Sequence, residues 1–288
     1  MPKDASPSMR TRNLADVIGA EILDVDLSIP LDDATFAAIK QAWLARNILL
    51  FRNQEALTPQ AQIAFSRRFG ELEYHTLPQY THPDFPEIFV VSNVVVEGKN
   101  VGAPRSGRNW HSDAQYRKEP SAASFLVAKE VPPEKGDTMF ANMYAAYDAL
   151  SAAMKKQIEG RKVLISRINA YPISYPSRPP LTDEERARVP DVVHPLVRTH
   201  PETGRKALYV GGDVAWDIVG MPHDEGRALI KELRDFATQP RFVYSHHWRV
   251  GDGILWDNRC SMHCATPFDE DRYRRHMYRT TIRGTVPF

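Results

Sequence analysis

The strongest constraint on the fold is a succession of short apolar segments that are too brief for core helices and are separated by turns. Residues 48–51 form a compact apolar run, and residues 88–96 are rich in β-branched side chains and end at a Glu-Gly turn. Further strands are predicted at 23–29, 122–127, 138–142, 162–168, 192–199, 206–210, 242–246, 253–256 and 275–283. These segments do not alternate regularly with helices, so the pattern predicts a mainly β fold, with an antiparallel β core and helices packed outside it.

A few segments carry helical signals instead. A helix is predicted after Asp32, whose carboxylate can cap it, and another after Thr58, because a hydroxyl N-cap followed by proline is a strong helix start. Residues 143–160 are predicted to be helical, as one or two short helices, and residues 225–238 to form an amphipathic helix. Residues 170–190 hold five prolines and are predicted to form an irregular loop that acts as a lid.

Composition narrows the class of protein. The 288 residues carry 37 Lys plus Arg against 36 Asp plus Glu, and this balance argues against a general nucleic-acid binder. No apolar run is long enough for a transmembrane helix, and no apolar signal core is visible. The two cysteines, Cys260 and Cys264, are too few for a disulfide framework. With no repeat or linker, we expect one cytoplasmic domain over residues 1–288, with neither nucleic acid nor a membrane as partner.

Among the ten histidines, His111 stands out because of its neighbours. In extended backbone His111 and Asp113 lie on the same face, so an imidazole and a carboxylate can bind one metal ion. The third ligand should come from a distant strand, and His263 is the best candidate. Two histidines and one carboxylate form the facial triad of non-haem iron(II) oxygenases, which leaves coordination positions open. Each other histidine, taken alone, is more simply explained by a structural role.

Two arginines after His263 make this pattern more specific. Arg275 and Arg279 are four positions apart in a strand-like segment, so both point to one face. Arginines inside a barrel are costly unless each meets an anion, and the planar guanidinium matches a carboxylate. One anion would be a dicarboxylate cosubstrate and the other the prime substrate. The simpler alternative is that both arginines pair with the acidic side chains at 269–271.

Longer motifs occur in the same order as in a known family. They are IAFSRRFG at 63–70, WHSD at 110–113, GDT at 136–138, HPLVRTH at 194–200, WDNR at 256–259 and the segment 275–284. Through them the chain, from about residue 18 to its end, resembles the iron(II)/2-oxoglutarate-dependent dioxygenases of the taurine dioxygenase and 2,4-dichlorophenoxyacetate dioxygenase (TauD/TfdA) family. The resemblance implies a double-stranded β-helix, or jelly roll, and a homo-oligomer, either a dimer or a tetramer.

The resemblance also implies the cofactors and the residues that bind them. Fe(II) would be held by His111, Asp113 and His263. The cosubstrate 2-oxoglutarate would be held through its distal carboxylate by Arg275, assisted by the Thr138 hydroxyl. Enzymes of this family use O2 to oxidise a C–H bond of the prime substrate, and they release succinate and CO2.

On the substrate side the resemblance is less detailed. It implies that Arg279 meets an acidic group of the prime substrate and that His75 contacts the same molecule. Asn93 and Ala114, the latter beside the metal ligands, are further candidates. The expected partner is a small organic anion, either a carboxylate or a sulfonate.

Several alternatives stay open. The same oxidant would also serve desaturation or ring formation on an amino-acid-like acid, whereas Asp113 argues against halogenation because it fills the position that a halide would take. A non-catalytic metal-binding jelly roll used for ligand sensing would keep the three ligands without turnover. A zinc hydrolase is disfavoured because no HExxH helix motif is present.

Overall fold

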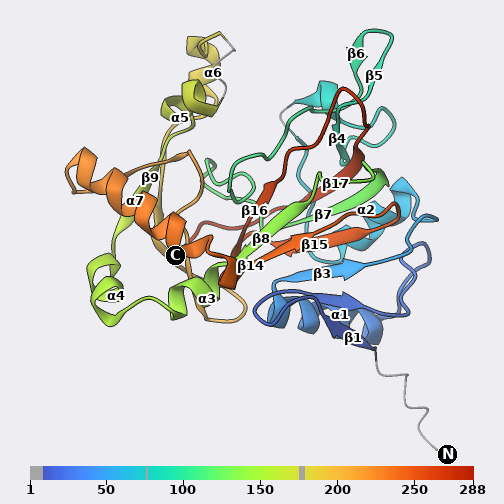
Figure 1. Ribbon diagram of the computed structural model, residues 1–288, viewed down its shortest axis with the longest axis horizontal. Coiled ribbons are helices and arrows are strands. Elements are labelled where there is room, and N and C mark those ends of the chain that lie inside the picture. The colour runs from blue at the N-terminus through green and yellow to red at the C-terminus, as the bar shows by residue number, and fades with distance from the viewer. Residues whose placement is uncertain (1–8, 76, 175–178) are drawn as a thin grey trace, which may run out of the picture.

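The computed structural model describes residues 9–75, 77–174 and 179–288, and its centre is a seven-stranded sheet (Figure 1). The strand order is β1-β2-β3-β15-β7-β17-β4, and every neighbouring pair is antiparallel except β2–β3. In that order the strands are Thr11–Asn13, Ala20–Ile22, Ile48–Phe51, Gly253–Asp257, Ala123–Glu130, His276–Ile282 and Phe89–Ser92. The prediction of a mainly β fold with a largely antiparallel core is confirmed.

A second, three-stranded sheet packs on the large one. Its order is β14-β8-β16, with bounds Val243–His246, Thr138–Asn142 and Ser261–Ala265. A further three-stranded sheet, β10-β9-β13, consists of Val192–Pro195, Lys162–Ile165 and Ala215–Ile218. Two hairpins complete the strands, β11 with β12 (Val197–Thr199, Lys206–Leu208) and β5 with β6 (Val95–Val96, Lys99–Asn100).

The helices lie around these sheets. They are α1 (Asp33–Arg46), α2 (Pro59–Arg67), α3 (Met143–Asp148), α4 (Ala152–Ile158), α5 (Arg167–Ser174), α6 (Asp183–Ala187) and α7 (His223–Ala237), with 3-10 turns η1 (Pro78–Tyr80) and η2 (Pro240–Phe242). Figure 1 shows α4 and α7 beside β9, on the side of the molecule away from α1, while α5 and α6 project above them. The predicted caps are confirmed, since Asp32 accepts from the Thr35 N–H and Thr58 from the Ala61 N–H.

Alternation along the strands of the large sheet produces two apolar layers. Leu255 of β15 packs in the layer that contains α1 and α2 residues. Its neighbours Ile254 and Trp256 point the other way and pack against Phe140 of β8, with the rings of Trp256 and Phe140 5.7 Å apart between centroids. Burying a side chain such as Ile254 or Phe140 contributes roughly 1.5–3 kcal/mol, so this inner layer fixes the two sheets against each other.

The same alternation points polar side chains between the two sheets. Leu126 of β7 and Met277 of β17 belong to the inner layer. Ser124 and Arg279 each lie two residues from one of them and therefore point to the same side. These two polar side chains enter the site described below.

Two local predictions were wrong. Residues 23–29 form no strand, because Asp24 adopts a left-handed backbone (φ 60°) and the Leu27 N–H donates to the Gln54 side chain rather than to a neighbouring strand. Residues 170–190 are not entirely irregular, because α5 reaches Ser174 and α6 occupies Asp183–Ala187. Residues 175–178 of that predicted loop lie outside the described residues, and its role as a lid stays a prediction.

The strand predicted at 192–199 is divided between two sheets. Its first half is β10, which pairs with β9, and its second half is β11, which pairs with β12. The predicted helical stretch 143–160 is two helices, α3 and α4, and the second is capped by Ser151. Both cysteines are buried and free.

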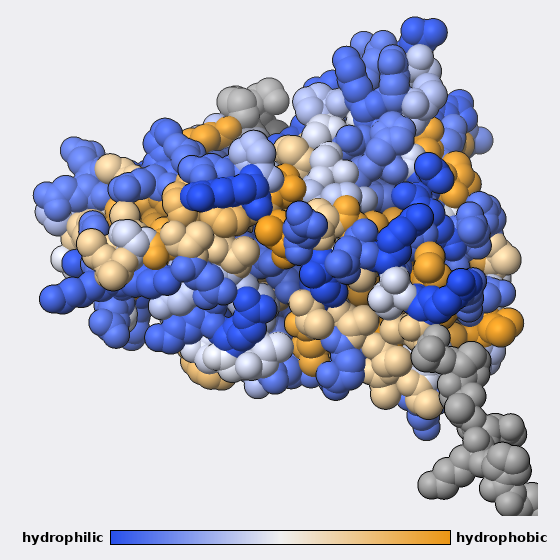
Figure 2. All heavy atoms as spheres, turned by 60° about the horizontal axis from the view of Figure 1, so that its bottom comes forward, coloured by the Kyte–Doolittle hydropathy of each residue, from blue (hydrophilic) through white to orange (hydrophobic). Residues whose placement is uncertain are grey.

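The face of the molecule drawn in Figure 2 is mainly polar. Figure 2 shows a largely hydrophilic face on which strongly apolar residues lie in small, separate patches. Among the described helices, none is both long enough and apolar enough to span a bilayer.

Candidate active site

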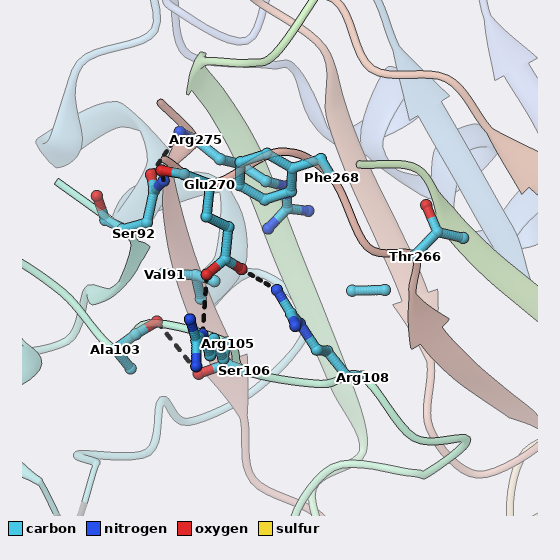
Figure 3. Close-up of a pocket in the computed structure, with 12 residues that line it drawn as sticks. Val91, Ser92, Ala103, Arg105, Ser106, Arg108, Thr266, Phe268, Glu270 and Arg275 are labelled. Atoms are coloured by element: carbon cyan, nitrogen blue, oxygen red, sulfur yellow. Dashed lines mark hydrogen bonds and ion pairs between the residues drawn. The ribbon is translucent and has the colours of Figure 1, made fainter. Parts of the chain in front are cut away.

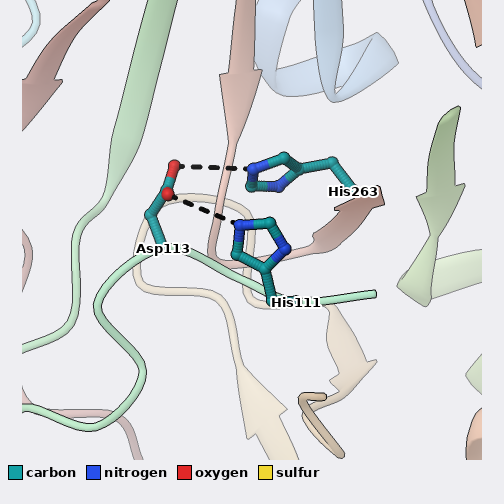
Figure 4. A group of neighbouring side chains, drawn as sticks. All are labelled: His111, Asp113 and His263. Carbon is teal, nitrogen blue, oxygen red and sulfur yellow. Dashed lines mark ion pairs between the residues drawn. The ribbon is translucent and has the colours of Figure 1, made fainter. Parts of the chain in front are cut away.

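Strand β16 and the segment that precedes β7 bring two distant histidines together. The His111 N–H donates to the His263 carbonyl (3.0 Å), and the His263 N–H donates to the His111 carbonyl (2.8 Å). This exchange is an isolated antiparallel bridge, and it places both side chains on one side of the paired backbones. The imidazole rings lie 4.1 Å apart between centroids (Figure 4).

Asp113 completes the group. His111 Nε2 lies 3.9 Å from Asp113 Oδ1, and His263 Nε2 lies 3.8 Å from Asp113 Oδ2 (Figure 4). One donor atom of each residue lies within 4.8 Å of the other two, which is close enough for all three to bind one metal ion. Two imidazoles and one carboxylate are the donor set of the iron(II) facial triad.

The surroundings keep these groups in the forms that bind metal, a neutral imidazole and an ionised carboxylate. Burial lowers the pKa of His263 to about 3, so its ring is neutral at neutral pH. Burial opposes ionisation of Asp113, but the charge of Arg279, aided by the hydrogen bond from Ser124 Oγ, holds the pKa of this carboxyl below its ordinary range.

Hydrogen bonds orient two of the three potential ligands. His111 Nδ1 lies 2.7 Å from the Asn109 carbonyl, and donation there leaves Nε2 free to face Asp113. Asp113 Oδ2 accepts from Ser124 Oγ at 2.7 Å. Ser124 was not predicted from the sequence, although the alternation of β7 points it between the sheets. Nδ1 of His263 has no hydrogen-bond partner in the described part of the chain.

Arg275 is a buried cation directly before β17. It is 7% exposed, and its Nε has no hydrogen-bond partner in the described part of the chain. Burial lowers the pKa of its guanidinium to about 10. The acidic residues at 269–271 do not pair with it within the described residues, so the simpler alternative from the sequence is wrong for Arg275.

A pocket adjoins Arg275, between the loop at 103–108 and the loop at 266–270 (Figure 3). Its one acidic lining residue, Glu270, binds Arg105 (3.0 Å) and Arg108 instead of Arg275. Asn93 also lines it, and its Oδ1 accepts the Arg275 N–H at 2.8 Å. The Asn93 amide nitrogen donates to the carbonyls of Glu270 (3.1 Å) and Tyr273 (2.9 Å). Asn93 thus fixes the position of the Arg275 backbone relative to the loop that precedes it.

Thr138 lies in β8, directly across from Ala265 of β16, which also lines this pocket. Its Oγ1 accepts a hydrogen bond from Trp248 Nε1 at 2.9 Å. Both side chains are buried, so the indole fixes the orientation of the Thr138 hydroxyl. Trp248 was missed by the sequence analysis, because no local pattern reveals a hydrogen bond to a residue so far away.

Arg279 has an unexpected partner. It donates from Nη1 to Asp113 Oδ1 at 3.0 Å, so it pairs with this carboxylate rather than with the acids at 269–271. Its guanidinium lies 5.0 Å over the Phe89 ring, against which His75 stacks at 3.8 Å. Burial, together with Arg279 and Arg117, lowers the pKa of His75 to about 3. The Arg279 guanidinium and the His75 ring therefore both pack against Phe89, near Asp113.

Ala114 lies in the turn that follows Asp113. Its φ is 53°, and its carbonyl accepts the Arg117 N–H at 2.9 Å. The turn places Tyr116 and Arg117 beside the site, where Arg117 forms an ion pair with Glu73. Neither Glu73 nor Arg117 was singled out from the sequence.

A second group of possible ligands exists in the described part of the chain, namely His200, Asp257 and Cys260. These groups are already engaged: His200 Nε2 binds Asp257 at 3.0 Å, and Arg259 binds both carboxylate oxygens of Asp257. The His200 Nδ1 accepts the backbone N–H of Glu202 at 3.2 Å. This arrangement is a buried structural network rather than an open metal site.

Comparison with known proteins agrees with this geometry. The family model described as "Taurine catabolism dioxygenase TauD, TfdA family" matches residues 10–281. The chain is 35% identical over 286 residues to the alpha-ketoglutarate-dependent 2,4-dichlorophenoxyacetate dioxygenase of Cupriavidus pinatubonensis, covering 94% of this chain and 96% of that protein. It is 34% identical to the (S)-phenoxypropionate/alpha-ketoglutarate-dioxygenase of Sphingobium herbicidovorans, covering 97% and 96% of the two chains.

The solved structures agree as well. The crystal structure of AAD-2 in complex with Mn(II) and N-oxalylglycine has a TM-score of 0.83 to this chain at 34% identity, covering 97% of this chain and 98% of that one. Family model, relatives and fold all extend over nearly the whole chain. The chain therefore belongs to the TauD/TfdA family and is an alpha-ketoglutarate-dependent dioxygenase.

Proposed function

We propose that this protein uses Fe(II), 2-oxoglutarate and O2 to oxidise a C–H bond of a small organic anion, with release of succinate and CO2. The observation that carries the proposal is the convergence of His111, Asp113 and His263 into one group of potential ligands between the two sheets. The neutral His263 ring and the ionised Asp113 carboxylate fit a divalent iron.

The residues of the site have two roles, metal binding and orientation of the ligands. His111, Asp113 and His263 hold the metal, which when bound supplies the redox chemistry that couples cosubstrate decarboxylation to substrate oxidation. Ser124 and the Asn109 carbonyl keep the ligands oriented. The metal would therefore be held by side chains that project from rigid backbone. Its other coordination positions would stay open for other molecules.

The cosubstrate side is built around Arg275. We assign the distal carboxylate of 2-oxoglutarate to this guanidinium, because it is buried and forms no ion pair with the described residues. The Thr138 hydroxyl assists, held in place by Trp248. Asn93 fixes the backbone of Arg275 through its side-chain oxygen.

The substrate side lies around His75, Arg279 and Ala114, next to the metal group. The relatives named above act on 2,4-dichlorophenoxyacetate and (S)-phenoxypropionate. We therefore assign to this chain a substrate of the aryloxyalkanoate class, with a carboxylate and an adjacent C–H bond. We further propose that the two packed sheets form a jelly roll, and that the protein is a cytoplasmic homo-oligomer.

A succinate-release screen tests this function. The protein would be supplied with Fe(II), 2-oxoglutarate and O2, together with a panel of aryloxyalkanoates, sulfonates, sulfate esters and amino acids. The proposal expects succinate formation to be strongly stimulated by at least one carboxylate, with an oxidised product of matching mass. Stimulation by none of the panel would contradict it.

A further inference from the structure

The charged side chains that line the pocket beside Arg275 lie at different depths. Arg275 is 7% exposed, whereas the side chains of Glu270, Arg108 and Arg105 are 15%, 36% and 72% exposed. This gradient places Glu270 between the buried Arg275 and the two arginines at the mouth of the pocket, as Figure 3 shows.

The Glu270 carboxylate is bound to both arginines at the mouth. Its Oε2 accepts from Arg105 Nε at 3.0 Å, and its Oε1 binds Arg108. Both outer guanidinium groups thus have a carboxylate partner, whereas the Nε of Arg275 has no hydrogen-bond partner among the described residues. An anion that enters the pocket therefore finds its unpaired cation at Arg275.

Backbone contacts fix Glu270 and its partners on the two sides of the pocket. The Glu270 carbonyl accepts from Asn93 Nδ2 at 3.1 Å, and Oδ1 of the same Asn93 accepts the Arg275 N–H at 2.8 Å. On the other side, the loop that carries both arginines is tied to the rest of the fold at Gly107, whose carbonyl accepts the Ala265 N–H at 2.7 Å. The ion pairs of Glu270 therefore join two anchored segments.

A carboxylate that extended past Arg275 would meet the negative charge of Glu270. In the proposed function the 2-oxo acid end of the cosubstrate faces the candidate metal group, so the length of the carbon chain decides how far the distal carboxylate reaches. Like charges a few ångströms apart in a partly buried pocket repel each other, and the arginines beyond are already paired. Glu270 therefore disfavours a 2-oxo diacid longer than 2-oxoglutarate.

We propose that Glu270 determines the chain length of the cosubstrate, and that it rejects 2-oxoadipate by charge repulsion on the outer side of Arg275. 2-Oxoadipate has the same two acid groups as 2-oxoglutarate and a longer carbon chain. This inference rests on the proposed function, and it adds a specificity-determining residue to the site for 2-oxoglutarate.

The test compares the binding of 2-oxoglutarate with that of 2-oxoadipate. The Kd of each acid is measured by anaerobic calorimetry on the protein loaded with Mn(II). The variants are Glu270→Gln, which removes the charge, and Glu270→Asp, which keeps it. The matched control is Glu87→Gln, which removes the same charge from an ion pair with Arg67 (2.8 Å) outside the lining of this pocket.

The unaltered protein should bind 2-oxoglutarate more tightly than 2-oxoadipate. In Glu270→Gln we expect the Kd of 2-oxoadipate to fall about 10- to 100-fold, because a released arginine replaces repulsion with a charge-assisted contact. The Kd of 2-oxoglutarate should change less than about 3-fold. Glu270→Asp and Glu87→Gln should both resemble the unaltered protein.

Three results would overturn the inference. They are an equal change for both acids in Glu270→Gln, no change for either acid, and an equal gain of 2-oxoadipate binding in Glu270→Asp. Failure of the proposed function shows itself differently, because then neither acid would bind to the Mn(II) form of the unaltered protein.

Discussion

The backbones of His111 and His263 exchange two hydrogen bonds, 3.0 and 2.8 Å long, although the residues lie in distant parts of the sequence. Their spacing is therefore set by paired main chain rather than by flexible side chains. Asp113 follows on the same segment as His111, so all three candidate ligand positions are determined by one bridge and one turn. Such preorganisation on rigid backbone is what a metal centre requires.

Ser124→Ala tests how far the Asp113 carboxylate depends on its hydrogen bond. Loss of the 2.7 Å bond from Ser124 Oγ frees this ligand to rotate, and we expect metal affinity to fall about 10- to 100-fold. Mn(II) titration followed by electron paramagnetic resonance measures the change. The control is Ser245→Ala, which removes a hydroxyl bound to Asp137 outside the metal group. Equal metal affinities in the two variants would show that Ser124 does not orient Asp113.

Arg275→Gln separates cosubstrate binding from metal binding. The variant removes the cation assigned to the distal carboxylate of 2-oxoglutarate, at a cost of about 2–3 kcal/mol, which corresponds to a Kd roughly 30 to 150 times higher. Mn(II) affinity should stay unchanged. Calorimetry on the Mn(II) form measures both, and exposed Arg274→Gln is the matched control. If both variants bind 2-oxoglutarate as the unaltered protein does, Arg275 has been assigned wrongly.

Arg259→Met should destabilise the fold rather than alter the chemistry. Asp257 and Arg259 are 1% and 6% exposed, and Arg259 binds both oxygens of the carboxylate at 2.9 and 2.7 Å. Removing one partner of a buried pair leaves an uncompensated charge and costs about 3–5 kcal/mol. Urea unfolding measures this cost. Arg205→Met, which breaks an exposed pair with Asp148, should cost about 1 kcal/mol or less, and similar costs for both variants would refute this interpretation.

Stability of the metal-free protein should fall as the pH is lowered below about 6.5, the ordinary histidine pKa. Burial lowers the pKa of His75 and His263 to about 3, and it also lowers those of His194, His246 and His276. Between these values the unfolded chain binds protons that the folded chain does not, so protonation favours unfolding. Each such histidine contributes up to about 1.4 kcal/mol per pH unit.

Urea unfolding in the presence of a chelator, at pH 7 and at pH 5, measures this dependence. His263→Gln removes one of the groups and should reduce the slope by up to about 1.4 kcal/mol per pH unit. A free energy of unfolding that is constant or larger at pH 5 would contradict the burial of neutral histidines.

Local sequence signals predicted those parts of the structure that depend on near neighbours. The caps at Asp32 and Thr58 mark helix starts because each side chain bonds to an N–H three residues on. The capping box of Thr182 and Glu185 at the start of α6 is the same kind of signal, and it was overlooked within a proline-rich segment. His111 and Asp113 were recognisable because their spacing matches the strand period.

Contacts between residues far apart in the sequence could not be predicted from local patterns. The alternation at 23–29 predicts a strand. In the structure the Leu27 N–H donates to the Gln54 side chain instead of to a neighbouring strand. The Arg279–Asp113 pair depends on how β17 lies beside β7, which no short motif records. Trp248 reaches Thr138 only after β14 and β8 have paired.

The central claim is that His111, Asp113 and His263 hold Fe(II) beside a site for 2-oxoglutarate. Its most direct test is an anaerobic titration of the metal-free protein with Fe(II) and 2-oxoglutarate, followed by visible absorption spectroscopy. We predict a weak charge-transfer band that saturates at one iron per chain, and that is absent when Asp113→Ala protein with an intact fold is titrated in the same way. Absence of the band in the unaltered, folded protein, or its persistence in Asp113→Ala, would contradict the account.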